Sequence, residues 1–105
     1  MAANLTVAAN KRVRGEILAL LYSVQPVPVE IRTITNSLLE SNMVSVPSIA
    51  QHIDYLSGKK YIQVIGEEAA KQILHGVVPP SAFVKLTPTG VDLVEGTIED
   101  QGVDV

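Results

Sequence analysis

Residues 46–62 read VPSIAQHIDYLSGKKYI, and this stretch decides the fold. Aliphatic residues recur in it at intervals of four and three, the spacing of one helix face: Ile49, Ile53 and Leu56. Gly58 favours a helix end, and the β-branched and aromatic residues after it favour a strand over 61–65. We therefore expect a helix over about 47–57 with one buried face and one open face.

The same patterns extend outward to the whole chain. Helices are predicted over about residues 8–24, 29–40, 47–57, 67–75 and 88–96, and strands over 61–65 and 82–86. The predicted fold class is mainly α with a small two-stranded antiparallel wing. Its order of elements, α-α-α-β-[short α]-β-α, is the plan of a winged helix-turn-helix. We expect a single domain over 1–105, in which residues 1–9 form a flexible or dimerising arm and 97–105 an acidic tail.

Two residues near the end of the chain have predicted local roles. Thr87 precedes Pro88 and is expected to cap the last helix. Gly90 lies inside that helix, where glycine costs about 1 kcal/mol relative to alanine. We therefore expect the helix to pack very closely there against the wing or the first helix.

The charge is unevenly distributed along the 105 residues. The net charge is −3, but residues 1–86 carry all eight basic and six acidic residues, and the remainder carries five acidic residues. The acidic average argues against indiscriminate coating of nucleic acid, although one basic face can still bind it. The absence of cysteine excludes disulfides and thiol catalysis. No apolar run is long enough to cross a bilayer, so we expect a soluble, cytoplasmic protein.

The stretch 46–62 resembles the recognition helix and first wing strand of winged-helix regulators of the MarR and ArsR kind. Residues 84–93, VKLTPTGVDL, are similar to the wing exit of the same group, which commonly reads Leu-Thr-Pro-x-Gly. The ending Asp92–Gly96 is also similar to small winged-helix proteins encoded in prophages. The resemblance implies a sequence-specific DNA-binding transcriptional regulator of prophage type, with double-stranded DNA as partner and a homodimer formed through terminal helices.

The resemblance also places the residues that would touch DNA. Side chains on the third helix would read bases or reach the phosphates beside them: Ser48, Gln51, His52 and Tyr55. Basic residues elsewhere would hold phosphates: Arg32, Lys59, Lys60 and Lys85.

The sequence departs from the family pattern in three respects. The glycine that usually precedes the wing strand is Lys60 here, the recognition helix carries Asp54 and no arginine, and the wing connection contains two glutamates. These departures keep a second interpretation open. The same fold would then be a protein–protein interaction module, with a phage-related assembly or adaptor role and no nucleic-acid binding.

The sequence contains no grouping of residues that indicates an enzyme. No nucleophile, base and orienting group are combined, and no glycine-rich phosphate loop is present. His52 and His75 are 23 positions apart, and neither has an acidic ligand three or four residues onward. We expect no catalytic residue, no metal and no cofactor.

Overall fold

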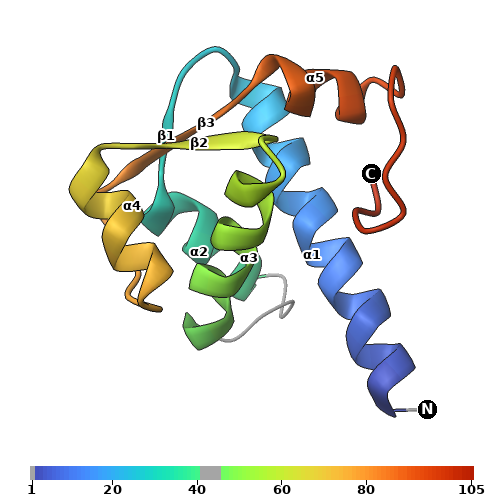
Figure 1. Ribbon diagram of the computed structural model, residues 1–105, viewed down its shortest axis with the longest axis horizontal. Helices are drawn as coiled ribbons and strands as arrows, with labels where there is room; N and C mark the ends of the chain where they lie inside the picture. The colour runs from blue at the N-terminus through green and yellow to red at the C-terminus, as the bar shows by residue number, and fades with distance from the viewer. Residues whose placement is uncertain (1, 41–45) are drawn as a thin grey trace.

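The computed structural model describes the backbone of residues 2–40 and 46–105 and the side chains of residues 7–40 and 49–105. Five helices and a three-stranded antiparallel sheet lie in these ranges (Figure 1). In chain order the elements are α1 (Ala2–Val24), β1 (Val29–Glu30), α2 (Ile31–Glu40), α3 (Val46–Gly58), β2 (Ile62–Ile65), α4 (Glu67–Leu74), β3 (Phe83–Leu86) and α5 (Pro88–Val94).

The sheet has three strands, so the prediction of a two-stranded wing was wrong. The strand order is β1-β3-β2, and both neighbouring pairs are antiparallel. The extra strand, β1, occupies the two residues that were predicted to begin the second helix, and its Val29 pairs with Val84. Pro28 disfavours helical backbone in the residue before it. The two residues after Pro28 are also extended and form β1, so the helix starts only at Ile31. A two-residue strand is too short to show the alternation by which strands are recognised in a sequence.

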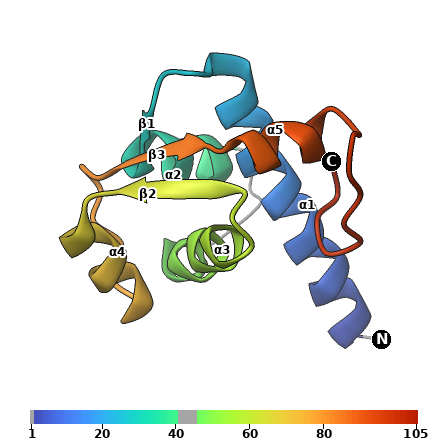
Figure 2. The same ribbon diagram turned by 45° about the horizontal axis from the view of Figure 1, so that its top comes forward.

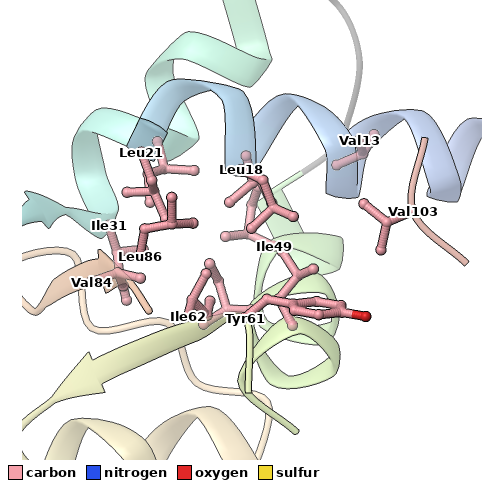
Figure 3. Close-up of a cluster of buried hydrophobic side chains, with 14 of the residues drawn as sticks. Val13, Leu18, Leu21, Ile31, Ile49, Tyr61, Ile62, Val84, Leu86 and Val103 are labelled. Carbon is pink, nitrogen blue, oxygen red and sulfur yellow. The ribbon is translucent and has the colours of Figure 1, made fainter. Parts of the chain in front are cut away.

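One face of the sheet is buried and the other is open. Ile62, Val84 and Leu86 point into the core, while Gln63 and the facing pair Ile65 and Phe83 lie on the outer face. Figure 2 shows the buried face turned toward α3. The core combines this face with aliphatic side chains of α1, α2 and α3 (Figure 3), among them Ile17, Leu18, Leu21, Ile31, Ile34, Ile49, Ile53 and Leu56.

The acidic C-terminal segment runs back along α1 instead of extending into solvent (Figure 1). Val103 is buried in the core cluster, and the backbone N–H of Asp104 donates to the carbonyl of Lys11 at 3.0 Å. Gly15 makes this approach possible, because a Cβ there would overlap the carbonyl oxygen of Asp104. The C-terminal segment is therefore part of the folded domain.

The predicted roles of Thr87 and Gly90 are confirmed. The Thr87 hydroxyl accepts a hydrogen bond from the N–H of Gly90, which caps α5, and donates one to the carbonyl of Lys60. A Cβ on Gly90 would overlap the carbonyl oxygen of Tyr61. The helix α5 can therefore lie directly against the start of β2.

The first helix starts earlier than expected. It begins at Ala2, before the predicted start near residue 8, so the segment proposed as an arm continues the helix. Alanine is the strongest helix former, and this segment contains four alanines. The N-terminal turns project beyond the rest of the molecule (Figures 1 and 2).

Candidate nucleic-acid interface

The helix α3 packs into the core through the aliphatic side chains that the sequence pattern predicted to be buried. Ile49, Ile53 and Leu56 are all completely buried, which confirms the prediction of one buried face. At 100° per residue, Gln51 and Asp54 lie on the opposite side of the helix, and both are exposed. This exposed side, together with Tyr55 and Gly58, is called the outer face of α3 below. The side chain of Ser48, also predicted there, lies outside the described residues.

His52 does not belong to the outer face, so its assignment as a DNA contact was wrong. Its side chain is only 2% exposed, and its Nδ1 has no hydrogen-bond partner. Burial lowers the pKa of His52, and the nearby positive charge of Arg14 lowers it further. The position lies about 100° round the helix from Gln51, on the flank that packs toward α1. A neutral, buried imidazole in that place cannot reach a duplex.

Tyr55 lies at the border of the outer face and is partly covered. The guanidinium carbon of Arg14 lies 3.7 Å from the centre of the Tyr55 ring, and the Lys59 ammonium lies 5.8 Å from it. These are cation–π distances. One guanidinium nitrogen of Arg14 also donates to the carbonyl of Gly102 at 3.0 Å. Arg14 thus links α1, α3 and the C-terminal segment, and it covers one side of a predicted DNA contact.

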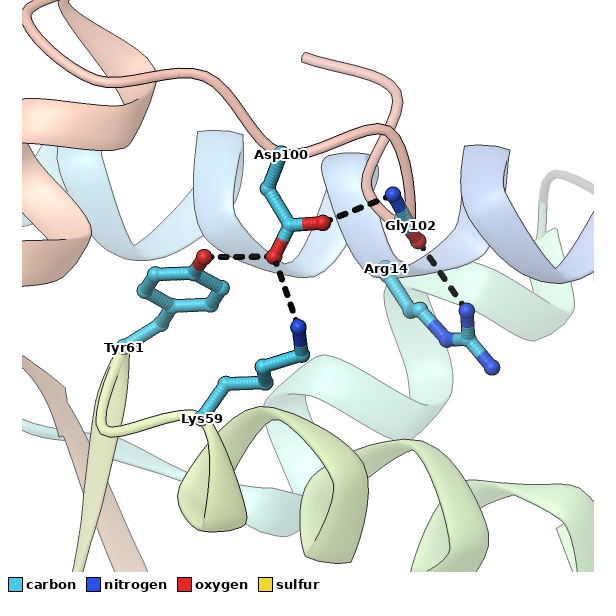
Figure 4. Close-up of polar contacts among 5 residues, drawn as sticks. All are labelled: Arg14, Lys59, Tyr61, Asp100 and Gly102. Atoms are coloured by element: carbon cyan, nitrogen blue, oxygen red, sulfur yellow. Dashed lines mark hydrogen bonds and ion pairs between the residues drawn. The ribbon is translucent and has the colours of Figure 1, made fainter.

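Lys59 is paired with the C-terminal segment. Its Nζ lies 3.2 Å from the carboxylate of Asp100, and this hydrogen bond and charge raise the pKa of Lys59 (Figure 4). The same carboxylate accepts hydrogen bonds from the Tyr61 hydroxyl at 2.5 Å and from the Gly102 N–H at 2.7 Å. A lysine in this arrangement is already neutralised within the chain, so it is a weaker phosphate contact than the sequence suggests.

Lys59, Tyr61, Asp100 and Gly102 are called the Asp100 cluster below, and their contacts shift the pKa values of Asp100 and Tyr61. The hydrogen bond from Tyr61 is the largest cause that lowers the pKa of Asp100, and the Gly102 N–H acts in the same direction. Burial, followed by the bond to Asp100, raises the pKa of Tyr61 to about 12. Sequence reasoning missed this cluster because five acids at the end of a chain resemble a solvated tail. Val103, an apolar residue among these acids, is the signal that the segment packs.

The remaining predicted phosphate contacts do not form one surface. Lys60 is exposed two residues after the end of α3, and its φ of 69° puts it in the left-handed region where the family pattern has glycine. Arg32 is exposed in the first turn of α2, where its backbone N–H donates to the carbonyl of Pro80. Lys85 alternates with the buried Val84 and Leu86, so it points to the outer face of the sheet, away from α3. Lys85 and the outer face of α3 therefore belong to different sides of the sheet.

The described residues contain neither a metal-binding cluster nor a membrane-spanning helix. None of their His, Asp and Glu side chains form a group of three or more that could hold a metal ion. None of their helices is both long and apolar enough to span a membrane.

The chain was compared with protein-family models, curated proteins and solved structures, and no match was found in any of the three.

Proposed function

We propose that this chain is a winged-helix protein that binds double-stranded DNA through the outer face of α3. The order of its elements supports this proposal. The helices α2 and α3 would form the helix-turn-helix, and β2 and β3, with α4 in the connection between them, would form the wing. The short β1 completes the sheet by pairing with β3 on the side away from β2.

The observation that carries the proposal is the opposite exposure of the two sides of α3. Its aliphatic side is fully buried, so the helix is held rigidly while Gln51 faces solvent. An α-helix fits the major groove of B-DNA, and a glutamine amide there can bond the N6 and N7 of adenine at once. Gln51 is the residue we assign to base reading.

The charges around α3 predict weak and salt-dependent binding. Lys60 is the exposed cation that follows the paired Lys59 after the end of the helix and is assigned to a phosphate, whereas Asp54 repels the DNA backbone. Each neutralised phosphate contributes about −0.9 to the slope of log affinity against log salt concentration. With few cations available, the protein depends on base contacts more than strongly basic winged helices do.

Fluorescence anisotropy with a labelled random-sequence duplex, at about 50 mM and 200 mM salt, tests this function. Asp54→Asn should tighten binding at low salt, and Lys60→Ala should weaken it and reduce the salt slope by about 1. Lys85→Ala removes the same charge from the opposite side of the sheet and should leave binding unchanged. The proposal is wrong if neither the wild-type chain nor Asp54→Asn binds duplex at low salt, or if Lys85→Ala weakens binding as much as Lys60→Ala does.

A second function, binding of a protein partner through the same face, is favoured by one observation. Asp54 lies exposed on the outer face while the neighbouring cation Lys59 is paired with Asp100, so this face repels phosphate and tolerates a protein surface. A photo-crosslinking residue at position 51 should then capture a protein, whereas the same residue at position 85 should not. Capture from both positions, or from neither, would exclude this second function.

A further inference from the structure

Lys59 lies at the border of the outer face of α3. Its backbone N–H donates to the carbonyl of Tyr55 at 3.0 Å, so Lys59 lies one helical turn beyond Tyr55. The Lys59 Nζ is 5.8 Å from the centre of the Tyr55 ring, and the lysine side chain is 45% exposed. The ammonium is therefore within reach of a ligand bound to the outer face.

The carboxylate beside Lys59 is held in place by other groups. The Tyr61 hydroxyl donates to the oxygen of Asp100 that also contacts the Lys59 ammonium. The Gly102 N–H donates to the other oxygen at 2.7 Å (Figure 4). The Asp100 side chain is only 12% exposed, and Val103, three residues later, is buried in the core. The carboxylate therefore keeps two hydrogen bonds and its position when the ammonium moves away.

The two partners of this ion pair differ in their freedom to move. Lys59 has a flexible four-carbon stem and is nearly half-exposed, whereas Asp100 is almost covered. Ion pairs with an exposed partner contribute little to stability, because water screens the charges and holding the long side chain costs entropy. A phosphate oxygen is also a strong acceptor for a lysine ammonium. The Lys59 side chain can thus leave Asp100 for a phosphate, and the fixed carboxylate opposes that exchange.

We propose that Asp100 is an autoinhibitory contact, which competes with the phosphates of a duplex for the Lys59 ammonium. The inference rests on the DNA binding by α3 proposed above and adds its regulation by the C-terminal segment. With Lys59 paired, the exposed Lys60 is left to hold a phosphate at the end of α3. With Lys59 released, two adjacent cations face the DNA backbone, so affinity and salt dependence both increase.

Two adjacent acids provide a matched test by fluorescence anisotropy with a labelled random-sequence duplex. Asp100→Asn removes the competing charge, whereas Glu99→Gln removes the same charge from an exposed neighbour. At about 50 mM salt, Asp100→Asn should bind at least about fourfold more tightly than Glu99→Gln. One additional phosphate contact adds about −0.9 to the salt slope, so this advantage should shrink about 3.5-fold at about 200 mM salt. Circular dichroism checks that both variants are folded.

Lys59→Ala tests the competition without altering Asp100. In the wild-type background it should reduce the salt slope by clearly less than the change of about 1 expected for Lys60→Ala, because Lys59 is held by Asp100. In the Asp100→Asn background the same substitution should remove the whole gain. The double variant should then bind no more tightly than Lys59→Ala alone.

Different results overturn the inference and the proposed function. Equal binding by Asp100→Asn and Glu99→Gln, in a chain that binds duplex, shows that Asp100 does not compete and leaves DNA binding by α3 intact. A gain that survives Lys59→Ala, or a wild-type slope that falls as much with Lys59→Ala as with Lys60→Ala, shows that Lys59 is not the shared cation. Failure of the wild-type chain, Asp54→Asn and Asp100→Asn to bind at low salt contradicts the DNA-binding proposal and this inference with it.

Discussion

The carboxylate of Asp100 lies 2.5 Å from the hydroxyl of Tyr61, 39 residues earlier in the chain. This contact fastens the C-terminal segment to the start of β2, where the carbonyl of Tyr61 also meets α5 at Gly90. Lys59 and the Gly102 N–H complete the surroundings of the carboxylate. The end of the chain is thereby anchored beside α3, and it changes the surface of α3 that is free to bind a partner.

Replacing Asp100 by asparagine tests this anchor. We expect Asp100→Asn to lower the free energy of unfolding by about 1.5–3 kcal/mol, since hydrogen bonds to a charged group are worth that much. Urea denaturation at pH 7 measures the loss. Asp92→Asn removes the same charge at an exposed position of α5 and should change stability by less than about 0.5 kcal/mol. Equal losses in both variants would show that the Asp100 contacts contribute nothing.

The anchor also has a predictable pH dependence. The pKa of Asp100 is lowered in the folded chain, so the unfolded chain binds its proton more readily. The stabilisation is therefore complete above the unfolded pKa, near 3.9, and is lost as pH falls through the lower folded value. The difference in stability between wild type and Asp100→Asn should shrink below about pH 4. A difference that stays constant from pH 7 to pH 3 would contradict this assignment.

His52 predicts a second pH effect, at milder acidity. Its folded pKa is lowered by burial and by Arg14, so protonation favours the unfolded chain. Stability should accordingly fall as pH drops below the unfolded value of about 6.5, until the folded pKa is reached. His52→Gln should abolish this fall between pH 7.5 and pH 5.5, measured by urea midpoints. The exposed His75→Gln is the matched control and should keep the wild-type pH dependence.

The buried side of α3 can be tested with a pair of leucines. Leu56 is completely buried and Leu74 is 71% exposed, so the same truncation removes core packing in one case and surface in the other. We expect Leu56→Ala to cost about 2–5 kcal/mol and Leu74→Ala less than about 0.5 kcal/mol. Equal costs would mean that α3 does not pack as described.

Two glycines predict opposite responses to the same substitution. A Cβ on Gly90 would overlap the Tyr61 carbonyl oxygen, and Gly90→Ala should destabilise the chain by at least about 1–3 kcal/mol. Gly58 has nothing within 4 Å of an added Cβ and lies in the last turn of α3. Gly58→Ala should therefore be neutral or stabilising by up to about 1 kcal/mol. Thermal unfolding of both variants checks the sign of each change.

Local patterns predicted most of the helices and two of the strands. The repeats of Ile49, Ile53 and Leu56 identified both α3 and its buried side, because helical periodicity is a property of neighbouring residues. The composition of residues 67–75 predicted the short helix in the connection between the strands, which the structure places at Glu67–Leu74. The strand β1 was missed because two residues are too few to show a strand pattern in the sequence. They form a strand only because they pair with β3 in the folded chain.

The candidate site was predicted less well, since its residues depend on contacts between distant parts of the chain. Gln51 and Lys60 are exposed as expected, but His52 is buried and Lys85 lies on the far side of the sheet. The helical angle of His52 places it on a flank, and a flank is exposed or buried according to whatever packs beside it. Here that neighbour is α1, which the local sequence does not reveal.

The amino-acid sequence by itself determined where the chain forms helices and strands, which side of α3 enters the core, and why α5 begins at Pro88 and needs Gly90. These features follow from periodicity, capping and steric limits within a few residues. Only the tertiary structure decided that the acidic end folds back, that Asp100 forms an ion pair with Lys59, and that His52 is buried. Those features arise because residues such as Tyr61 and Asp100 come into contact only after the whole chain has packed. Their separation of 39 residues follows no local pattern from which the contact could be predicted.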